Sequence, residues 1–270
     1  MVLKGSKERQ YKSAVDKELK SVEKLEKKME AVAMKEPRSD WKAALESKVP
    51  EKVLHNLEKA FCKGFEVVFQ KGSAVIEKSY NRDEIEQDFS IHQYAFGLKA
   101  NRKELRKKNK EVSKANSRNM VITTVEGIGL GALGIGLPDI VLFVGMLLKG
   151  VYEIALSFGF DYDMPEERYL ILKMLETSML KGEAWVRENA KLDEMMEMIS
   201  TPSKEEIKMQ IKQTAERFAV DMLVLKFIQG MPIVGVIGGA SNPIYYNKVM
   251  KYVQLKYRKR YLMKLKKKKL

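Results

Sequence analysis

The sequence has little of the side-chain chemistry on which many enzymes and secreted proteins depend. Its 270 residues include one cysteine, Cys62, and two histidines, His55 and His92. A single thiol builds no disulfide framework, which fits a reducing compartment. The opening residues, MVLKGSKERQYK, contain no apolar run, so we expect no secretory signal. Walker loops, nucleophile elbows, paired CxxC motifs and HExxH motifs are all missing, so no familiar catalytic class is indicated.

Long uncharged apolar runs are also scarce. A membrane-spanning helix needs about 20 consecutive apolar residues. Residues 127–138 and 140–148 form uncharged runs of only 12 and 9 residues. The uncharged stretch 227–247 has 21 residues, but Pro232, Pro243 and several polar side chains interrupt it. These segments predict a buried core, with shallow insertion into a membrane surface as the alternative.

Helical periodicity, in contrast, is present along most of the chain. Apolar residues make up 45% of it, which is enough for a sizeable core. They recur every three or four residues, as in Val15, Leu19 and Val22, and this spacing predicts amphipathic helices. We therefore expect an all-α fold, a multi-helix domain around a glycine-rich apolar helical hairpin. The predicted organisation is a charged amphipathic helical extension over 1–39, a main helical domain over 40–265 and a basic tail over 266–270.

Short polar motifs predict where several helices begin. Asp163 with Glu166 has the spacing of a capping box, with a proline in the first turn. Ser203 with Glu206 has the same spacing. The pair Asn242–Pro243 predicts the start of the last helix, because asparagine suits the N-cap and proline the first helical position.

Glycine is concentrated in residues 119–160, where we expect two apolar arms to form a helix–turn–helix hairpin. Gly129, Gly131 and Gly134 match the dinucleotide-binding pattern G-x-G-x-x-G. In that motif a helix starts within the glycines, whereas Pro138 would break such a helix in its first turn. Close packing of helices is the favoured interpretation, and no cofactor is expected. The residues assigned to this packing and its turn are Gly127, Gly131, Gly134, Gly136, Pro138 and Asp139.

Positive charge is distributed unevenly. The net charge is +14, and residues 248–270 contain eleven basic and no acidic side chains. Residues 99–118 contain nine basic and two acidic side chains. Such segments suit an anionic membrane surface and, less well in this context, nucleic acid. The candidate residues for binding a membrane or a partner are Lys256, Arg258, Lys259, Arg260, Lys264, Lys266, Lys267, Lys268 and Lys269.

Two weak signals point to catalysis. His55 and Cys62 lie seven residues apart and could share a helix face, but a thiol nucleophile also needs an activating environment. An acidic cluster could hold a divalent cation, but helix capping already explains two of its members, so no metal site is predicted. The members of this cluster are Asp161, Asp163, Glu166 and Glu167.

Two long stretches resemble the EcsC family. They are residues 127–172, GIGLGALGIGLPDIVLFVGMLLKGVYEIALSFGFDYDMPEERYLIL, and residues 232–262, PIVGVIGGASNPIYYNKVMKYVQLKYRKRYL. Their order and spacing agree with that family, and the resemblance extends over about residues 40–262. The family is named after the third gene of a bacterial operon whose other two products form an ABC transporter. The resemblance therefore implies an accessory role near a membrane transport system and supplies no catalytic residues. Besides the glycines and the turn, it covers Asp161, Asn242, Pro243, Tyr257 and Tyr261.

These observations lead to one main functional hypothesis and two alternatives. We expect a non-enzymatic accessory protein in the cytoplasm, peripheral to the inner face of the cell membrane. Its basic C-terminal helix would bind anionic lipid, and an ABC transporter or another membrane protein would be its partner. The alternatives are a hydrolase that uses the acidic cluster or Cys62, and a nucleic-acid-binding protein that uses the basic tail.

Overall fold

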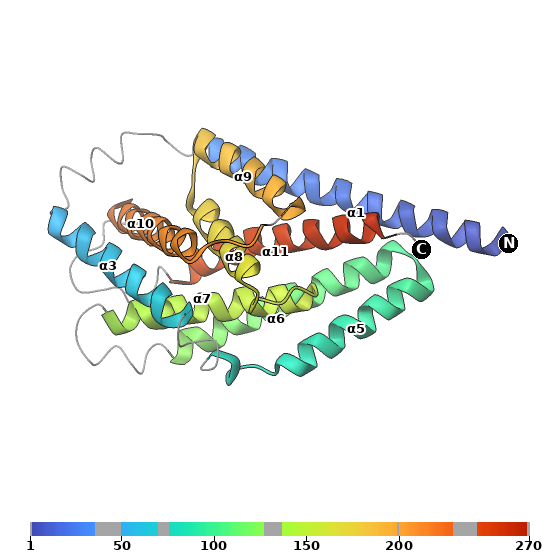
Figure 1. The fold of residues 1–270 in the computed structure, drawn as a ribbon, viewed down its shortest axis with the longest axis horizontal. Coiled ribbons are helices and arrows are strands. Elements are labelled where there is room, and N and C mark those ends of the chain that lie inside the picture. The colour runs from blue at the N-terminus through green and yellow to red at the C-terminus, as the bar shows by residue number, and fades with distance from the viewer. Residues whose placement is uncertain are drawn as a thin grey trace.

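The computed structural model describes residues 2–35, 50–69, 76–126, 137–198, 200–228 and 242–268. All regular secondary structure within these ranges is helical, so the predicted all-α fold is confirmed. Figure 1 shows how the helices are arranged. In chain order they are α1 (Val2–Lys35), α3 (Glu51–Val67), α5 (Arg82–Lys99), α6 (Arg102–Glu126), α7 (Leu137–Ser157), α8 (Pro165–Met179), α9 (Gly182–Glu197), α10 (Lys204–Ile228) and α11 (Asn242–Lys267).

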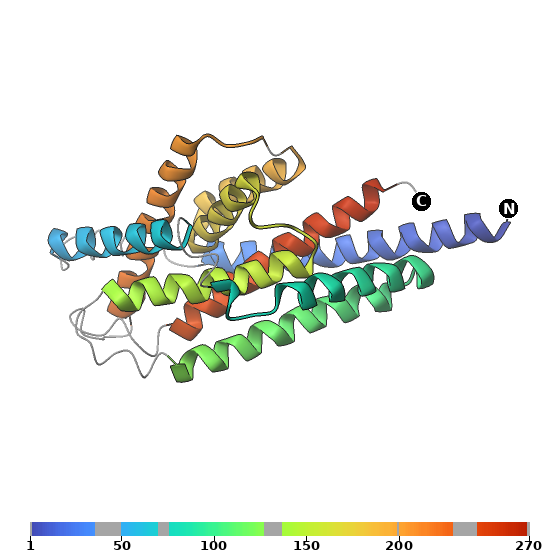
Figure 2. The ribbon, with the colours of Figure 1, turned by 60° about the horizontal axis from the view of Figure 1, so that its bottom comes forward.

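Two of the longest helices, α1 and α11, lie antiparallel and in contact along the molecule (Figures 1 and 2). The apolar positions predicted on α1 explain this contact, since Val15, Leu19 and Val22 are buried. α1 therefore shares one apolar core with the helices of the main domain. The predicted boundary near residue 39 falls outside the described ranges, and the division into 1–39, 40–265 and 266–270 stays a prediction.

Helix α7 packs closely against α3 and α11 because a glycine lies at each contact, Gly64 of α3 at one and Gly150 of α7 itself at the other. Val144 is fully buried, and a Cβ added at Gly64 of α3 would lie 3.2 Å from its side chain. On the side of α11, a Cβ added at Gly150 would lie 2.8 Å from the sulfur of Met250. Glycine thus allows the close approach of helices in this core, as expected for an apolar helix rich in small residues.

The predicted glycine hairpin lies only partly within the described ranges. Its second arm is α7, which begins at Leu137 with Pro138 and Asp139 in the first turn, as predicted. The last helix, α11, begins at Asn242 followed by Pro243, also as predicted. The packing of the first arm stays a prediction, because the glycines assigned to it lie outside the described ranges: Gly127, Gly131, Gly134 and Gly136.

The two predicted capping boxes have different outcomes. At α10 the box is confirmed: the backbone N–H of Ser203 donates to Glu206 at 2.7 Å, and the N–H of Glu206 donates to Ser203 Oγ at 3.1 Å. At α8 the prediction is wrong. Met164 occupies the N-cap position and its side chain forms no capping hydrogen bond. Asp163 is instead engaged by two arginines, which leaves its carboxylate unavailable to the helix.

Candidate functional site

The predicted basic surface on α11 includes two lysines whose charges are compensated inside the protein. Lys256 has 0% exposed surface, and its Nζ lies 2.5 Å from Glu26 of α1 and 2.7 Å from Asp193 of α9. Lys259 lies one turn later and contacts the other oxygens of the same two carboxylates, at 2.6 and 2.7 Å. Two ammonium groups and two carboxylates thus form a closed set that joins α1, α9 and α11.

A second buried set centres on Glu18 of α1. Its carboxylate accepts hydrogen bonds from Arg258 of α11 and from Arg102 and Arg106 of α6. The distance from Arg106 Nε is 3.0 Å. Because three guanidinium groups converge on one carboxylate, this set fixes α1 between α6 and α11.

The third set lies between α11 and α8. Arg260 Nη1 contacts both carboxylate oxygens of Glu167, at 2.8 and 2.7 Å. The hydroxyl of Tyr257 donates to the same carboxylate at 2.7 Å. Of the family-block residues, Tyr257 therefore has a structural position, and the Tyr261 ring likewise packs edge-on against Phe89, with centroids 6.0 Å apart.

The pKa values of the buried glutamates reflect this pairing. Burial alone would raise the pKa of Glu26, but the charge of Lys256 and the hydrogen bonds from Lys256 and Lys259 hold it below its ordinary value. Burial is likewise outweighed at Glu18, where Arg102, Arg258 and Arg106 lower the pKa. Both carboxylates therefore stay ionised, as a buried ion pair requires if it is to offset its desolvation.

These contacts narrow the predicted basic surface. In this structure the charged groups of Lys256, Arg258, Lys259 and Arg260 face internal partners, so the sequence prediction that they bind an outside surface is corrected. The residues that remain exposed are Lys264, Lys266, Lys267 and Lys268. Lys269 lies outside the described residues.

The exposed lysines of α11 belong to a larger basic surface. Both termini and the α5–α6 turn lie at the same end of the molecule (Figures 1 and 2). The Tyr11 and Phe96 rings, 4.7 Å apart, connect α1 with α5 there, and the Lys266–Asp16 ion pair at 3.0 Å connects α11 with α1. We call the following exposed residues the basic end: Lys7, Arg9, Lys99, Lys103, Lys264, Lys266, Lys267 and Lys268.

Much of the charge at the basic end has no acidic partner. Lys99, Lys266 and Lys267 form ion pairs, with Glu104, Asp16 and Glu197 respectively. Within the part of the chain that the structure describes, the other members of the basic end form no ion pair: Lys7, Arg9, Lys103, Lys264 and Lys268. This end of the molecule therefore presents uncompensated positive charge to solvent.

The acidic cluster predicted as an alternative site is neutralised by arginine. Arg82 of α5 contacts Asp163 at 2.6 Å and Asp161 at 2.9 Å, and Arg168 contacts Asp163 at 3.2 Å. Glu167 faces α11, as described above, and Glu166 accepts a hydrogen bond from Thr201. The four carboxylates therefore do not converge on a common point. Among the described residues no group of three metal-ligating side chains is found.

A tyrosine network lies beside this cluster and accounts for its position. Tyr162 is buried, its ring stacks on Tyr152 with centroids 4.1 Å apart, and its hydroxyl donates to Glu77 at 2.7 Å. Tyr80 donates in turn to the Tyr162 hydroxyl at 2.6 Å. Burial raises the pKa of Tyr80 to about 12. The Asp161–Asp163 segment is thus held against α5 and α7 by aromatic stacking and hydrogen bonds.

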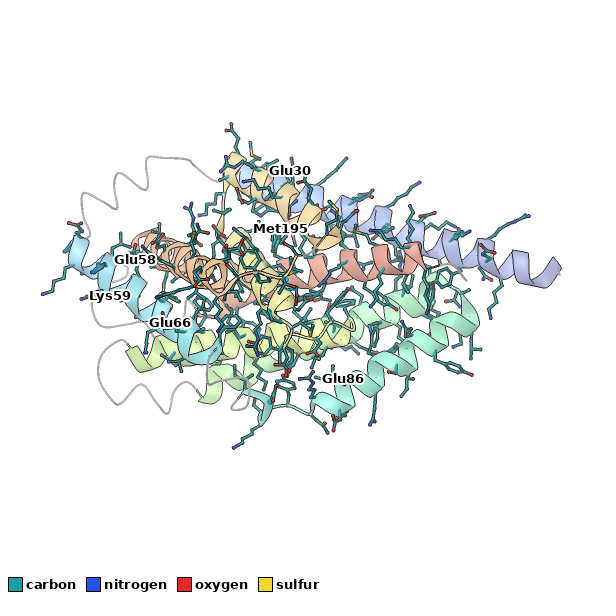
Figure 3. All side chains as sticks on the ribbon, in the orientation of Figure 1. Glu30, Glu58, Lys59, Glu66, Glu86 and Met195 are labelled. Carbon is teal, nitrogen blue, oxygen red and sulfur yellow. The ribbon has the colours of Figure 1, made fainter. Side chains whose placement is uncertain are left out.

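Cys62 lies in an environment that opposes nucleophilic chemistry. It is half-buried on α3. Glu58 and Glu66, which Figure 3 labels on the same helix, lie four residues before and after it in the sequence. Burial raises the pKa of its thiol, and Glu66 and Glu216 raise it further. Since the thiolate is the reactive form, this site lacks the activation that a catalytic cysteine needs.

Sequence reasoning identified the basic helix but missed its internal partners. Glu18, Glu26 and Asp193 lie in charged helices whose polar residues are typical of solvated faces. The available signal was that Glu18 and Glu26 follow the apolar positions of α1 by three or four residues, which places them at the edge of its buried face. Which cation each would meet depends on contacts between helices that lie from 63 to 240 residues apart in the sequence.

Comparison with known proteins gives one match. The family model of the EcsC protein family matches residues 15–262. Neither the curated proteins nor the solved structures include a match. Within the described residues, no helix combines the length and the apolar character that crossing a membrane requires.

Proposed function

The chain belongs to the EcsC protein family, and from that premise we propose that it is a non-enzymatic accessory protein on the cytoplasmic face of the cell membrane. The observation that carries this proposal is the basic end, where three separate parts of the chain expose lysine and arginine. Basic residues close to an anionic membrane each contribute about 1 kcal/mol. Several together would hold the protein at the surface, most strongly at low ionic strength.

An exposed apolar stripe on α5 supports the proposal that this end of the molecule contacts the membrane. Ile91, Tyr94 and Leu98 are 63%, 70% and 55% exposed, and their spacing places them along one face of the helix. The stripe leads to Lys99 and the α5–α6 turn, so it is continuous with the basic end. Exposed apolar and aromatic side chains beside basic ones suit the interface between lipid headgroups and acyl chains. We assign the stripe to shallow contact with the anionic bilayer.

The family relationship suggests the setting of this membrane contact. The resemblance implies a link with an ABC transport system, and we propose a transporter or another membrane protein as the partner. The basic end would hold the chain at the membrane, which leaves α3 and α10 at the opposite end free to face the cytoplasm (Figure 1).

Vesicle co-sedimentation tests the proposal. The full chain should bind vesicles that contain phosphatidylserine and not neutral vesicles, and binding should weaken as salt is raised. Replacing Lys264, Lys266, Lys267 and Lys268 together by glutamine should reduce the affinity at least about tenfold, given the contribution of each basic contact. A matched control replaces four exposed lysines of α3 and α10, at the opposite end: Lys52, Lys59, Lys63 and Lys208.

The two variants have the same net charge. A difference in their vesicle binding therefore distinguishes binding by the basic end from an effect of the net charge of the whole protein. Equal loss of binding in both would contradict a defined basic end, and equal binding by the wild type to neutral vesicles would contradict the electrostatic basis. Addition of duplex DNA provides a competition test for the nucleic-acid alternative. If DNA displaces the protein from vesicles and binds it more tightly than they do, the partner assignment is wrong.

A further inference from the structure

A pocket of about 280 Å³ lies between α5, α6 and the C-terminal part of α7. None of its lining residues belongs to the basic end. Aromatic and aliphatic side chains line one part and ionisable groups line another. The ionisable residues that face it are Glu84, Asp88, His92, Lys108, Glu111 and Glu153.

Lys108 is the least expected of these groups. It belongs to the basic segment of α6, yet only 5% of its surface is exposed. Its Nζ lies 4.1 Å from the centre of the Phe89 ring, 5.7 Å from that of Tyr261 and 5.9 Å from that of Phe158. In the described part of the chain it forms no ion pair. The amine therefore lies against aromatic rings at the pocket wall, and no carboxylate of the described residues lies within ion-pair distance of it.

One glycine makes room for the aromatic rings that surround Lys108. Gly159, directly after Phe158, has a φ of +77°, which lies in the left-handed region that glycine adopts readily. A Cβ at this position would overlap the ring of Phe89. Because Gly159 has no side chain, the tip of the Phe89 ring can approach the loop closely, and Lys108 Nζ lies 4.1 Å from the centre of the same ring.

This environment changes the chemistry of the amine. Burial lowers the pKa of Lys108 to about 7, although Glu111 and Asp88 act in the opposite direction. An ordinary lysine has a pKa near 10.4, so only about one amine in a thousand is neutral at pH 7.4. A lysine desolvated against aromatic rings, with a pKa of about 7, is largely neutral at that pH, and the neutral amine is the nucleophile.

We propose that this pocket binds a small aldehyde or ketone and that Lys108 holds it as an imine. The amine lone pair forms a C–N bond to the carbonyl carbon while the carbonyl π electrons move to oxygen, which takes a proton. That oxygen takes a second proton and leaves as water, while the nitrogen loses two protons in all and its lone pair forms the second C–N bond, so the imine and water are the only products. His92, whose Nε2 lies 2.5 Å from Glu111 Oε2, lines the same pocket.

The pocket also limits which carbonyl compounds fit. Its volume is at the lower end of the range for ligand sites, so the ligand is small. The four carboxylates that face it, on Glu84, Asp88, Glu111 and Glu153, repel an anionic ligand. The site therefore favours uncharged or cationic carbonyl compounds over oxo acids and phosphorylated sugars.

Reductive trapping on the intact wild-type chain tests the proposal. The protein is incubated at pH 7.4 with propanal and cyanoborohydride, and the modified lysines are quantified by mass spectrometry of peptides. Lys108 should be modified at least about tenfold more than exposed Lys251 on α11, because burial lowers the pKa of Lys108 to about 7 and leaves its amine largely neutral at pH 7.4. Buried Lys256, whose ammonium is paired, should remain unmodified. Modification of Lys108 should rise with pH through about pH 7 and then level.

Two further measurements make the outcome decisive. Glyoxylate, an anionic aldehyde, should modify Lys108 several-fold less than propanal, and Glu111→Gln should reduce that difference. Modification of Lys108 only after denaturation, or at the same level as Lys256, would overturn the proposal. Preferential reaction with glyoxylate would overturn the assignment of the ligand class. Neither outcome depends on membrane binding, so this proposal and the proposed function fail independently.

Discussion

Lys256 and Lys108 are both buried, but their surroundings are opposite. Lys256 lies between the carboxylates of Glu26 and Asp193, at 2.5 and 2.7 Å. Lys108 lies on the ring of Phe89 and, within the described residues, pairs with no carboxylate. Both come from segments that read as basic and solvated in the sequence. The comparison shows that burial can affect a lysine in opposite ways. At Lys256 the neighbouring carboxylates stabilise the charged ammonium, whereas at Lys108 burial disfavours the charged form.

The difference follows from what each helix packs against. α11 faces α1 and α9, which bring carboxylates to its lysines, whereas the buried face of α6 at Lys108 meets aromatic rings from α5, α11 and the α7–α8 loop. A buried charge that is paired stays with its partners, and removal of one partner is strongly destabilising. An uncompensated amine loses its proton near neutral pH and becomes available for chemistry.

The largest effect is expected at Lys256. The substitution Lys256→Met leaves Lys259 as the one cation paired with Glu26 and Asp193 among the described residues. Breaking a buried pair in this way typically lowers the free energy of unfolding by about 3 to 5 kcal/mol. Urea unfolding at pH 7 measures it. Lys251→Met, at an exposed position of the same helix, should change stability by less than about 0.5 kcal/mol. Equal stabilities of the two variants would show that the closed set of charges is not needed.

The matching substitution at Lys108 should have the opposite sign. Since the folded protein lowers the pKa of Lys108 to about 7, the unfolded chain binds more protons between about pH 7 and 10, and wild-type stability rises with pH there. Lys108→Met removes this penalty. It should stabilise the protein below pH 7 by roughly 1.4 kcal/mol for each unit of pKa lowering, and the gain should fade towards pH 10. A pH-independent difference between the two proteins would contradict the lowered pKa.

Acid should weaken the paired region and not the Lys108 pocket. The pKa values of Glu18 and Glu26 are lowered from 4.5 in the folded protein. Their contribution to the free energy of unfolding is therefore fully present above about pH 4.5. It is lost as the pH falls through the pKa values of the folded protein, by roughly 1.4 kcal/mol for each unit by which a pKa is lowered. Urea unfolding from pH 7 to pH 3 measures it. Glu26→Gln should flatten this dependence, and an unchanged slope would mean that Glu26 is not the group that titrates.

The smallest effect on stability is expected on α5. Replacing Ile91 and Leu98 by serine should change the free energy of unfolding by less than about 0.5 kcal/mol, because both are exposed. It should nevertheless reduce the part of vesicle binding that survives high salt. The control replaces Met198 and Met209, which are 85% and 62% exposed elsewhere on the molecule, by serine. An equal loss of vesicle binding in both double variants would indicate non-specific hydrophobic adsorption, with no particular role for the α5 stripe.

Sequence reasoning was most successful where structure depends on nearby residues. The all-α fold, the start of α7 near Pro138, the start of α11 at Asn242 and the capping box at Ser203 follow from contacts within a few residues. The prediction at Asp163 failed because Arg82, 81 residues away, competes for the carboxylate that the local pattern assigned to a helix cap. Local spacing carries no information about such a competitor.

The sequence by itself therefore determined the helices, most of their boundaries and the family, because hydrophobic periodicity and capping chemistry are local. Only the tertiary structure decided which charges of the basic segments face solvent. It placed Lys256, Arg258, Lys259 and Arg260 against carboxylates from distant helices, left Lys264 to Lys268 at the basic end, and put Lys108 against aromatic rings. The physical reason is that the state of a charge depends on the groups within a few ångströms, and in a helical bundle those groups come from parts of the chain that only folding brings together.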